Sequence, residues 1–214
     1  ALNPAAREGE DARDRADIAD AGWRRWGPVQ GAAVGLHLLS GIAILAEHPD
    51  QWEAAAADPS LVNGLVDEVI RWVTPLNNMF RRVLSDDHIG DQPVKAGERV
   101  MLAYPSANRD EAVFDDPFRF DILRDPNPHL AFGRGTHFCV GANLARLELR
   151  RLFAALTRRW TNLRVVTAPD IEPNVFAGAV RRFDLAFDLA RPFLTKWVTG
   201  QVTAYANQRF GSRR

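Results

Sequence analysis

The sequence predicts a mainly α-helical protein with small β-sheets. Three apolar runs have the length or spacing of helices, at residues 31–47, 61–72 and 145–160. Between the second and third runs, residues 79–104 break into short apolar stretches separated by glycine and proline, which is typical of short strands and turns. With 214 residues, 46% of them apolar, the chain can build one substantial core.

The three helices are predicted by different patterns. Residues 31–47 form an almost continuous apolar run, typical of a buried helix, that ends at "HPD". The second helix has apolar residues at helical spacing before Pro75, namely Leu61, Leu65, Val66, Val69 and Trp72. One face of the third is traced by Ala145, Leu149, Leu152, Phe153, Leu156 and Trp160.

The remaining segments predict strand, loop and tails. Residues 181–190 alternate apolar Phe183, Leu185, Phe187 and Leu189 with other residues, which predicts a half-buried strand. Residues 106–135 are long, rich in proline and irregular, and loops of this length are usually functional or disordered. We predict a folded domain over 27–190, between a charged segment at 1–26 and a basic tail at 191–214.

Composition excludes some classes of function. Acidic and basic residues balance at 27 each, so no global field directs the chain to nucleic acid or an acidic membrane. The apolar run at 31–46 contains His37 and Ser40 and is too short to span a membrane. No signal peptide is visible, and the start at Ala1 suggests a processed or incomplete chain. We expect a cytoplasmic protein, with RNA or membrane binding by the basic tail as a remote alternative.

Cys139, the only cysteine, lies in "FGRGTHFCVG" directly before the third helix. A lone cysteine is most often a small buried hydrophobic residue. Here the surrounding glycines permit close approach of a large flat group, and the start of a helix favours a thiolate. One cysteine cannot build a closed zinc site, and His137 nearby completes no protease triad. An axial thiolate for haem iron needs only one cysteine in such a loop.

This stretch resembles the haem-binding loop of cytochrome P-450 monooxygenases, Phe-Gly-x-Gly-x-His/Arg-x-Cys-x-Gly. All fixed places match: Phe132, Gly133, Gly135, His137, Cys139 and Gly141. The resemblance runs from about residue 31 to residue 190. Within the family, the chain is most similar to soluble actinobacterial enzymes that hydroxylate steroid side chains. It implies the C-terminal, haem-loop half of that fold, with haem b as cofactor and Cys139 as the iron ligand. Gly133 and Gly141 are then cofactor-binding residues of the loop.

A second motif, "EVIR" from Glu68 to Arg71, lies on the second helix. Positions i and i+3 share a helix face, so the two side chains can meet, although such a pair alone is usually a surface ion pair. In the family this pair is joined by an arginine from the irregular segment. The resemblance assigns Arg119 of "DPFRFD" to that place. The three residues are expected to form a structural lock rather than catalytic groups.

The resemblance also assigns residues to the haem periphery. Arg82 and His137 match family positions that pair with the haem propionates, which need cationic or hydrogen-bonding partners when buried. Arg81 would face the opposite side of its strand and be solvated. Phe132 should lie on the thiolate side of the haem, where an apolar ring shields the sulfur.

The implied activity is insertion of one oxygen atom of O2 into a small apolar substrate, a steroid or another lipid. Electrons would come from ferredoxin and ferredoxin reductase. The family's proton-relay motif aligns with "VQGAAV", where Ala32 and Ala33 replace the acid and the alcohol, and no catalytic residue is assigned. The N-terminal half of the family fold has no counterpart in the sequence. Three hypotheses remain: a functional monooxygenase fragment, a haem-binding remnant without efficient turnover, and a domain that no longer holds haem.

Overall fold

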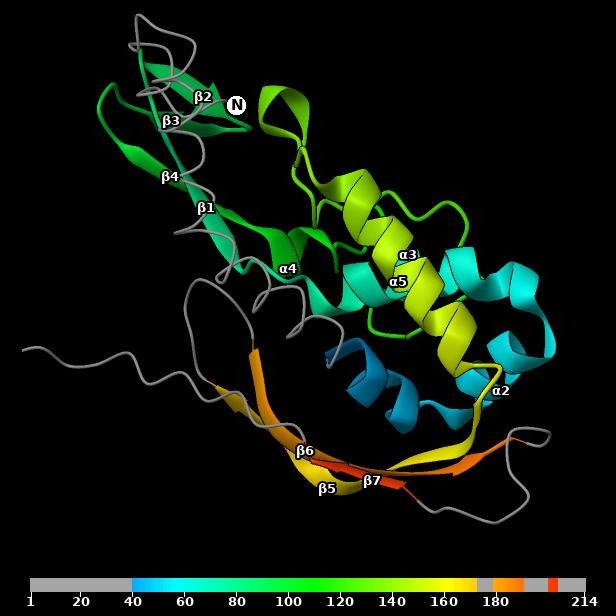
Figure 1. The fold of residues 1–214 in the computed structure, drawn as a ribbon. Helices are drawn as coiled ribbons and strands as arrows, with labels where there is room; N and C mark the ends of the chain where they lie inside the picture. Colours follow the sequence, from blue (N-terminus) through cyan, green and yellow to red (C-terminus); the bar gives the residue numbers. More distant parts are fainter. Residues whose placement is uncertain (1–39, 173–178, 191–199, 204–214) are drawn as a thin grey trace, which may run out of the picture.

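The computed structural model describes residues 40–172, 179–190 and 200–203. Its helices lie between two sheet regions, with a three-stranded sheet along one side and a two-stranded pair extending from the other (Figure 1). Residues 40–47 are helical, and the further helices are α2 (Pro49–Ala57), η2 (Pro59–Leu61), α3 (Val62–Val73), α4 (Tyr104–Ala107), η3 (Gly135–His137) and α5 (Ala142–Leu156). Small sheets beside a helical core agree with the predicted fold class.

The strands are antiparallel. They are β1 (Asn78–Arg82), β2 (Asp87–Ile89), β3 (Gln92–Val94), β4 (Arg99–Ala103), β5 (Trp160–Glu172), β6 (Ala179–Leu189) and β7 (Gly200–Thr203). Strand β1 pairs with β4, β2 with β3, and β6 lies between β5 and β7. Strand β7 falls within the segment that the sequence left unassigned as a basic tail.

The core forms where the predicted helix faces meet. Helices α3 and α5 pack together, and α2 contacts β5. Fully or almost fully buried apolar side chains include Leu45, Trp52, Leu65, Val66, Phe153, Phe183 and Leu185. Thus the apolar spacing of the second helix and the alternation of 181–190 both correspond to buried faces. The first predicted helix is described only from residue 40 onward.

The third helix is shorter than its apolar pattern suggested. It ends at Leu156, where the Thr157 hydroxyl donates a hydrogen bond of 2.8 Å to the carbonyl oxygen of Phe153. Trp160 instead begins β5, and its ring stacks on Phe187 at 4.1 Å between centroids. The prediction that Trp160 continues the helix face was therefore wrong, because the helix ends at Leu156 and Trp160 packs against Phe187 from a strand.

The irregular segment packs directly onto α3. The backbone carbonyl oxygen of Ile122 lies so close to Gly64 that a Cβ atom there would be only 2.2 Å away. Glycine at this position therefore allows the loop backbone to contact the helix. Within the described residues, no helix is long and apolar enough to cross a membrane.

Candidate functional site

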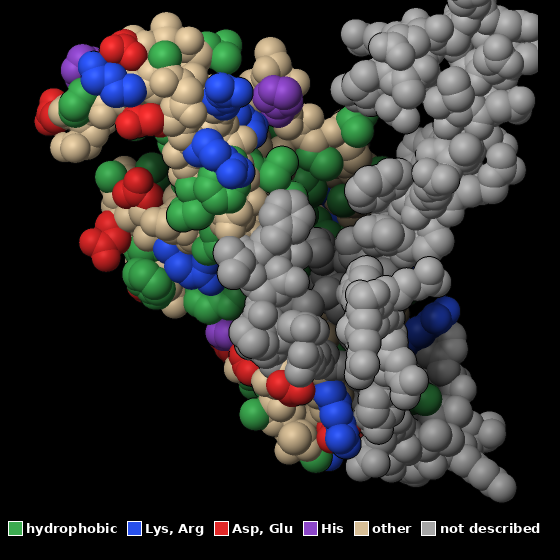
Figure 2. All heavy atoms as spheres, turned by 90° about the vertical axis from the view of Figure 1, so that its left-hand side faces the viewer, with side chains coloured by type: hydrophobic (Ala, Val, Ile, Leu, Met, Phe, Trp, Pro, Cys, Tyr) green, Lys and Arg blue, Asp and Glu red, His purple; other side chains and the backbone are tan. Residues whose placement is uncertain are grey.

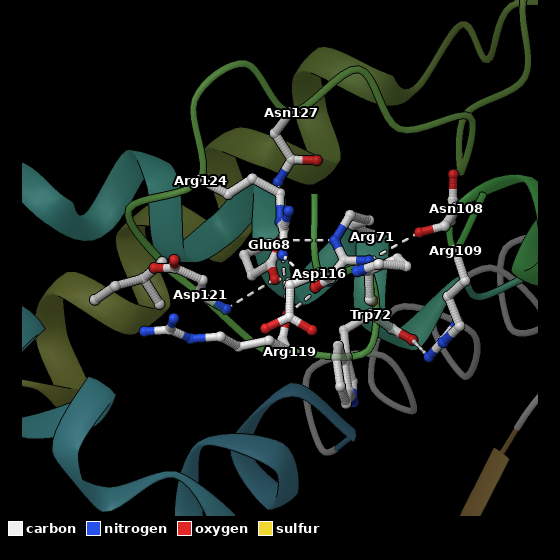
Figure 3. A network of polar contacts seen from close by, with 12 residues as sticks. Glu68, Arg71, Trp72, Asn108, Arg109, Asp116, Arg119, Asp121, Arg124 and Asn127 are labelled. Carbon is white, nitrogen blue, oxygen red and sulfur yellow. Dashed lines mark hydrogen bonds and ion pairs between the residues drawn. The ribbon is translucent and has the colours of Figure 1, made fainter. Parts of the chain in front are cut away.

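Glu68 and Arg71 form a fully buried ion pair on α3. Arg71 donates from Nε to Oε2 and from Nη2 to Oε1 of Glu68, both at 2.7 Å, and both side chains are 0% exposed (Figure 3). The two-point geometry is the strongest form of arginine–carboxylate contact. Because the partners are three positions apart on one helix, the spacing brings the two side chains together as the sequence suggested.

The remaining partners of Glu68 come from the irregular segment. The backbone N–H of Asp121 donates to Oε1 at 2.9 Å, and the Asn127 side-chain amide donates to Oε2 at 3.0 Å. Arg124 approaches Oε2 with its Nε at 3.4 Å, as an ion pair without hydrogen-bond geometry. One carboxylate on α3 therefore holds the segment 121–127 at three places.

The third arginine of the predicted lock is corrected by this geometry. Arg119 is exposed and its side chain points away from Glu68, while its backbone carbonyl oxygen accepts a hydrogen bond from Arg71 at 3.2 Å (Figure 3). Arg124, whose side chain is only 9% exposed, also donates to that carbonyl, at 3.0 Å. We call Glu68, Arg71 and Arg124 the charge network. The course of the loop brings the backbone carbonyl of Arg119 and the guanidinium of Arg124 together beside the Glu68–Arg71 pair.

Arg71 also anchors backbone far along the chain. Its Nη1 donates to the carbonyl oxygens of Asn108 at 2.8 Å and Pro117 at 2.9 Å. The buried Asn108 side chain in turn accepts from the backbone N–H of Leu130 at 2.7 Å and donates to the Thr74 hydroxyl at 2.8 Å. Leu130 lies two residues before Phe132, where the loop that carries the cysteine begins. The charge network is therefore linked through Asn108 to the stem of that loop, residues 129–131.

The cysteine loop, residues 132–141, begins with two glycines in the left-handed region. Gly133 has φ +71° and Gly135 has φ +72°, a conformation that L side chains rarely adopt. The backbone N–H of Cys139 donates to the carbonyl oxygen of Phe132 at 2.9 Å, which closes the loop. The Cys139 thiol is free and exposed, and α5 starts three residues later at Ala142.

One side of the cysteine loop is open. Residues 134–140 are all exposed, including the apolar Phe138 and Val140, the latter 93% exposed. No heavy atom lies within 4 Å of where a Cβ of Gly135 would be, and a Cβ of Gly141 would lie 3.8 Å from the cysteine sulfur. His137 is exposed in the short turn η3. In the described residues, no group of three or more His, Cys, Asp or Glu side chains could hold a metal ion.

Arg82 and Arg81 occupy opposite faces of β1. Arg82 is exposed on the face that also carries Phe80, whereas Arg81 is half-buried and pairs in register with Val100. Exposed hydrophobic side chains lie beside basic ones on this side of the molecule (Figure 2). Arg99, for example, lies 4.8 Å above the ring of Phe80. Ala32 and Ala33 lie outside the described residues.

Comparison with known proteins agrees with the family resemblance seen in the sequence, over most of the described residues. The family model for cytochrome P450 matches residues 47–181. The chain belongs to the cytochrome P450 family. It is 43% identical over 161 residues to the steroid C26-monooxygenase of Mycolicibacterium smegmatis, covering 74% of this chain and 40% of that protein. It is 41% identical to cytochrome P450-terp of a Pseudomonas species, over 68% of this chain and 34% of that one.

Solved structures of cytochromes P450 show the same architecture. Cytochrome P450 CYP109Q5 from Chondromyces apiculatus superposes with a TM-score of 0.69 at 38% identity, covering 74% of this chain and 41% of that one. CYP108D1 from Novosphingobium aromaticivorans gives 0.70 at 35% identity, covering 74% and 38% respectively. The chain thus spans about two fifths of the length of the first of these relatives, in sequence and in structure alike.

The residues of the cysteine loop fit a haem in their chemistry. Cytochromes P450 hold the haem iron by a cysteine thiolate. Here one exposed thiol lies on the open side of a loop whose glycines leave room beside it. The two donor residues assigned to the propionates, Arg82 and His137, are both exposed and so are available to a bound group.

Sequence reasoning missed several residues around the charge network, namely Asn108, Asp121, Arg124 and Asn127. The Asp121 contact uses backbone N–H, which no sequence pattern reveals. Arg124 carried a usable signal, since a long irregular segment leaves carbonyl oxygens that need donors. Its guanidinium donates to the carbonyl oxygens of Asp115 at 2.6 Å and Asp116 at 3.1 Å.

Proposed function

We propose that this chain carries the haem-thiolate part of a cytochrome P450 monooxygenase, with Cys139 as the axial ligand of haem b. The observation that carries the proposal is the exposed Cys139 thiol on the open side of a glycine-lined loop directly before α5. When bound, the haem supplies an iron at which dioxygen is activated, so that one oxygen atom enters the substrate and the other leaves as water.

The chain's own residues bind and orient that group. The Cys139 thiolate would hold the iron and donate electron density to it, and the Phe132 ring would keep water from the bound sulfur. Arg82 and His137 would hold the propionates by donating hydrogen bonds to them. Glu68, Arg71 and Arg124 hold the irregular segment against α3, so they support the site without contacting the reacting atoms.

A small apolar substrate, a steroid or another lipid, is the proposed target. Several of the similar proteins bear the name steroid C26-monooxygenase, at 43% or 46% identity. Electrons would come from a ferredoxin and its reductase, which act in the cytoplasm. Because the chain spans only part of those relatives, substrate and partner rest on similarity of the shared part.

A second candidate is a haem-binding remnant without efficient turnover. The observation that favours it is the pair Ala32 and Ala33, which stand where the family relay has an acid and an alcohol. Neither methyl side chain can deliver a proton, and removing a relay group typically costs about 10²–10⁴ in rate.

Reconstitution of the purified chain with haem separates these hypotheses. The chain is titrated with haem, then supplied with ferredoxin, reductase, NAD(P)H and a panel of steroids and fatty acids. Stoichiometric haem uptake with oxygenated product supports the monooxygenase. Uptake without product supports the remnant. Failure to take up haem would contradict both and leave a domain that no longer binds the cofactor.

A further inference from the structure

A second charged cluster joins α3, α5 and the stem of the cysteine loop. Asp67 on α3 accepts a hydrogen bond from Arg146 Nε of α5 at 2.7 Å. The His129 Nε2 atom lies 3.5 Å from the same Asp67 oxygen and 3.4 Å from Arg146 Nη2. We call these three residues the Asp67 cluster. It is separate from the charge network, although Asp67 and Glu68 are neighbours on one helix.

The Asp67 cluster reaches the cysteine through Phe132. The Arg146 guanidinium carbon lies 4.7 Å from the centroid of the Phe132 ring, and the His129 ring lies 5.9 Å from it. The carbonyl oxygen of Phe132 accepts the backbone N–H of Cys139 at 2.9 Å. A displacement of Phe132 would therefore move the hydrogen bond that closes the cysteine loop.

We propose that Asp67 and Arg146 are positioning residues for the Cys139 thiol. The Asp67 carboxylate fixes the Arg146 guanidinium, which lies over the Phe132 ring, and Phe132 holds the backbone of Cys139. The role of the thiol as an iron ligand rests on the proposed function. The positioning of the loop is a property of the chain itself and can be measured without haem.

Burial and chemistry distinguish the Asp67 cluster from an ordinary surface ion pair, which contributes little. The side chain of Arg146 is 22% exposed and that of His129 is 2% exposed. A guanidinium can donate in its plane and stack on an aromatic face at the same time, which an ammonium cannot. Burial by itself would raise the pKa of Asp67, but the hydrogen bonds from His129 and Arg146 outweigh it and lower that pKa.

Two substitutions remove the contact from opposite ends. Asp67→Asn removes the charge that fixes Arg146, and Arg146→Leu removes the guanidinium itself. Arg146→Lys keeps the positive charge but removes the guanidinium that lies over Phe132. It covers the case in which Arg146→Leu fails to fold. Arg150→Leu is the matched control, because Arg150 is exposed on the same helix about one turn later.

The first measurement is hydrogen–deuterium exchange of the haem-free full chain. In Asp67→Asn, Arg146→Leu and Arg146→Lys, amides of residues 132–141 should exchange about tenfold faster than in the parent, and amides of α3 should accelerate much less. All amides of Arg150→Leu should stay unchanged. Loop exchange within about twofold of the parent would overturn the proposal. So would an equal acceleration in α3, because that result means general destabilisation.

The second measurement is spectroscopic, at equal haem content. The reduced carbon-monoxide complex of the three variants should show a smaller share of the red-shifted thiolate band than the parent or Arg150→Leu. An unchanged share would contradict the positioning of sulfur. If the parent takes up no haem but the loop exchange still responds as stated, the proposed function fails and the positioning of the loop stands.

Discussion

Arg71 makes two hydrogen bonds of 2.7 Å to Glu68, and neither side chain is exposed to solvent. Breaking a buried pair of this kind by removing one partner typically costs about 3–5 kcal/mol, because the other charge is left uncompensated. The pair has a structural role, since its remaining hydrogen bonds go to the backbone and side chains of an irregular segment. It holds that segment at residues between Asn108 and Asn127, before the cysteine loop begins.

Arg124 and Arg119 provide a matched test of the charge network. Arg124→Ala should lower the free energy of unfolding by at least about 2 kcal/mol, because it removes charged hydrogen bonds to three carbonyl oxygens and an ion pair with Glu68. Arg119→Ala should stay within about 0.5 kcal/mol, since that side chain is exposed. Denaturant unfolding of both variants measures the difference. A larger loss of unfolding free energy in Arg119→Ala than in Arg124→Ala would favour the predicted lock of Glu68, Arg71 and Arg119.

The sequence identified the parts of the site that depend on local spacing. Glu68 and Arg71 are one helical turn apart, and the glycines around Cys139 lie within ten residues, so pattern alone could bring them together. The choice between Arg119 and Arg124 depends on the path of the loop over α3, which Gly64 allows by close contact. The contacts of Asp67 with His129 and Arg146 span 62 and 79 residues, and no local pattern encodes them.

The free energy of unfolding should depend on pH because of the Asp67 carboxyl. Its pKa is lowered from the ordinary value of 3.8 in the folded state, so it contributes stability above that value and loses it as the pH falls through the lower folded pKa. Asp67→Asn should therefore be less stable than the parent near neutral pH. The gap should close at pH values below 3.8. Urea unfolding of the two proteins across this range measures the gap, and a constant difference would contradict the assignment.

Arg82 and Arg81 test the assignment of the strand faces. Haem should be retained less well by Arg82→Ala than by Arg81→Ala, because the proposed function assigns a propionate to Arg82 and none to Arg81. Transfer of haem to a scavenging globin in excess gives the rate of loss for each variant. Equal rates would count against the propionate role. In a haem-bound structure, Arg82 and His137 should each place a nitrogen within about 3 Å of a propionate oxygen.

Because Ala32 and Ala33 cannot deliver protons, we expect little product per NAD(P)H consumed. The reconstituted chain should release peroxide for most of the NAD(P)H that it consumes, because the proposed alignment puts two methyl side chains where the family has its proton donors. The double change Ala32→Asp with Ala33→Thr should raise product per NAD(P)H. The same change at Ala55 and Ala56 of α2 is not a usable control, because Ala55 is buried in the core. The exposed Glu47→Gln is a suitable control. Tightly coupled turnover by the parent would show that the relay lies elsewhere.

The most direct test of the central claim is the reduced carbon-monoxide difference spectrum of the haem-reconstituted chain. If Cys139 is the axial thiolate, the parent should show the strongly red-shifted band that gives cytochromes P450 their name, and Cys139→Ser should lose it at equal haem content. A parent that takes up haem without this band, or a Cys139→Ser variant with an unchanged spectrum, would contradict the account.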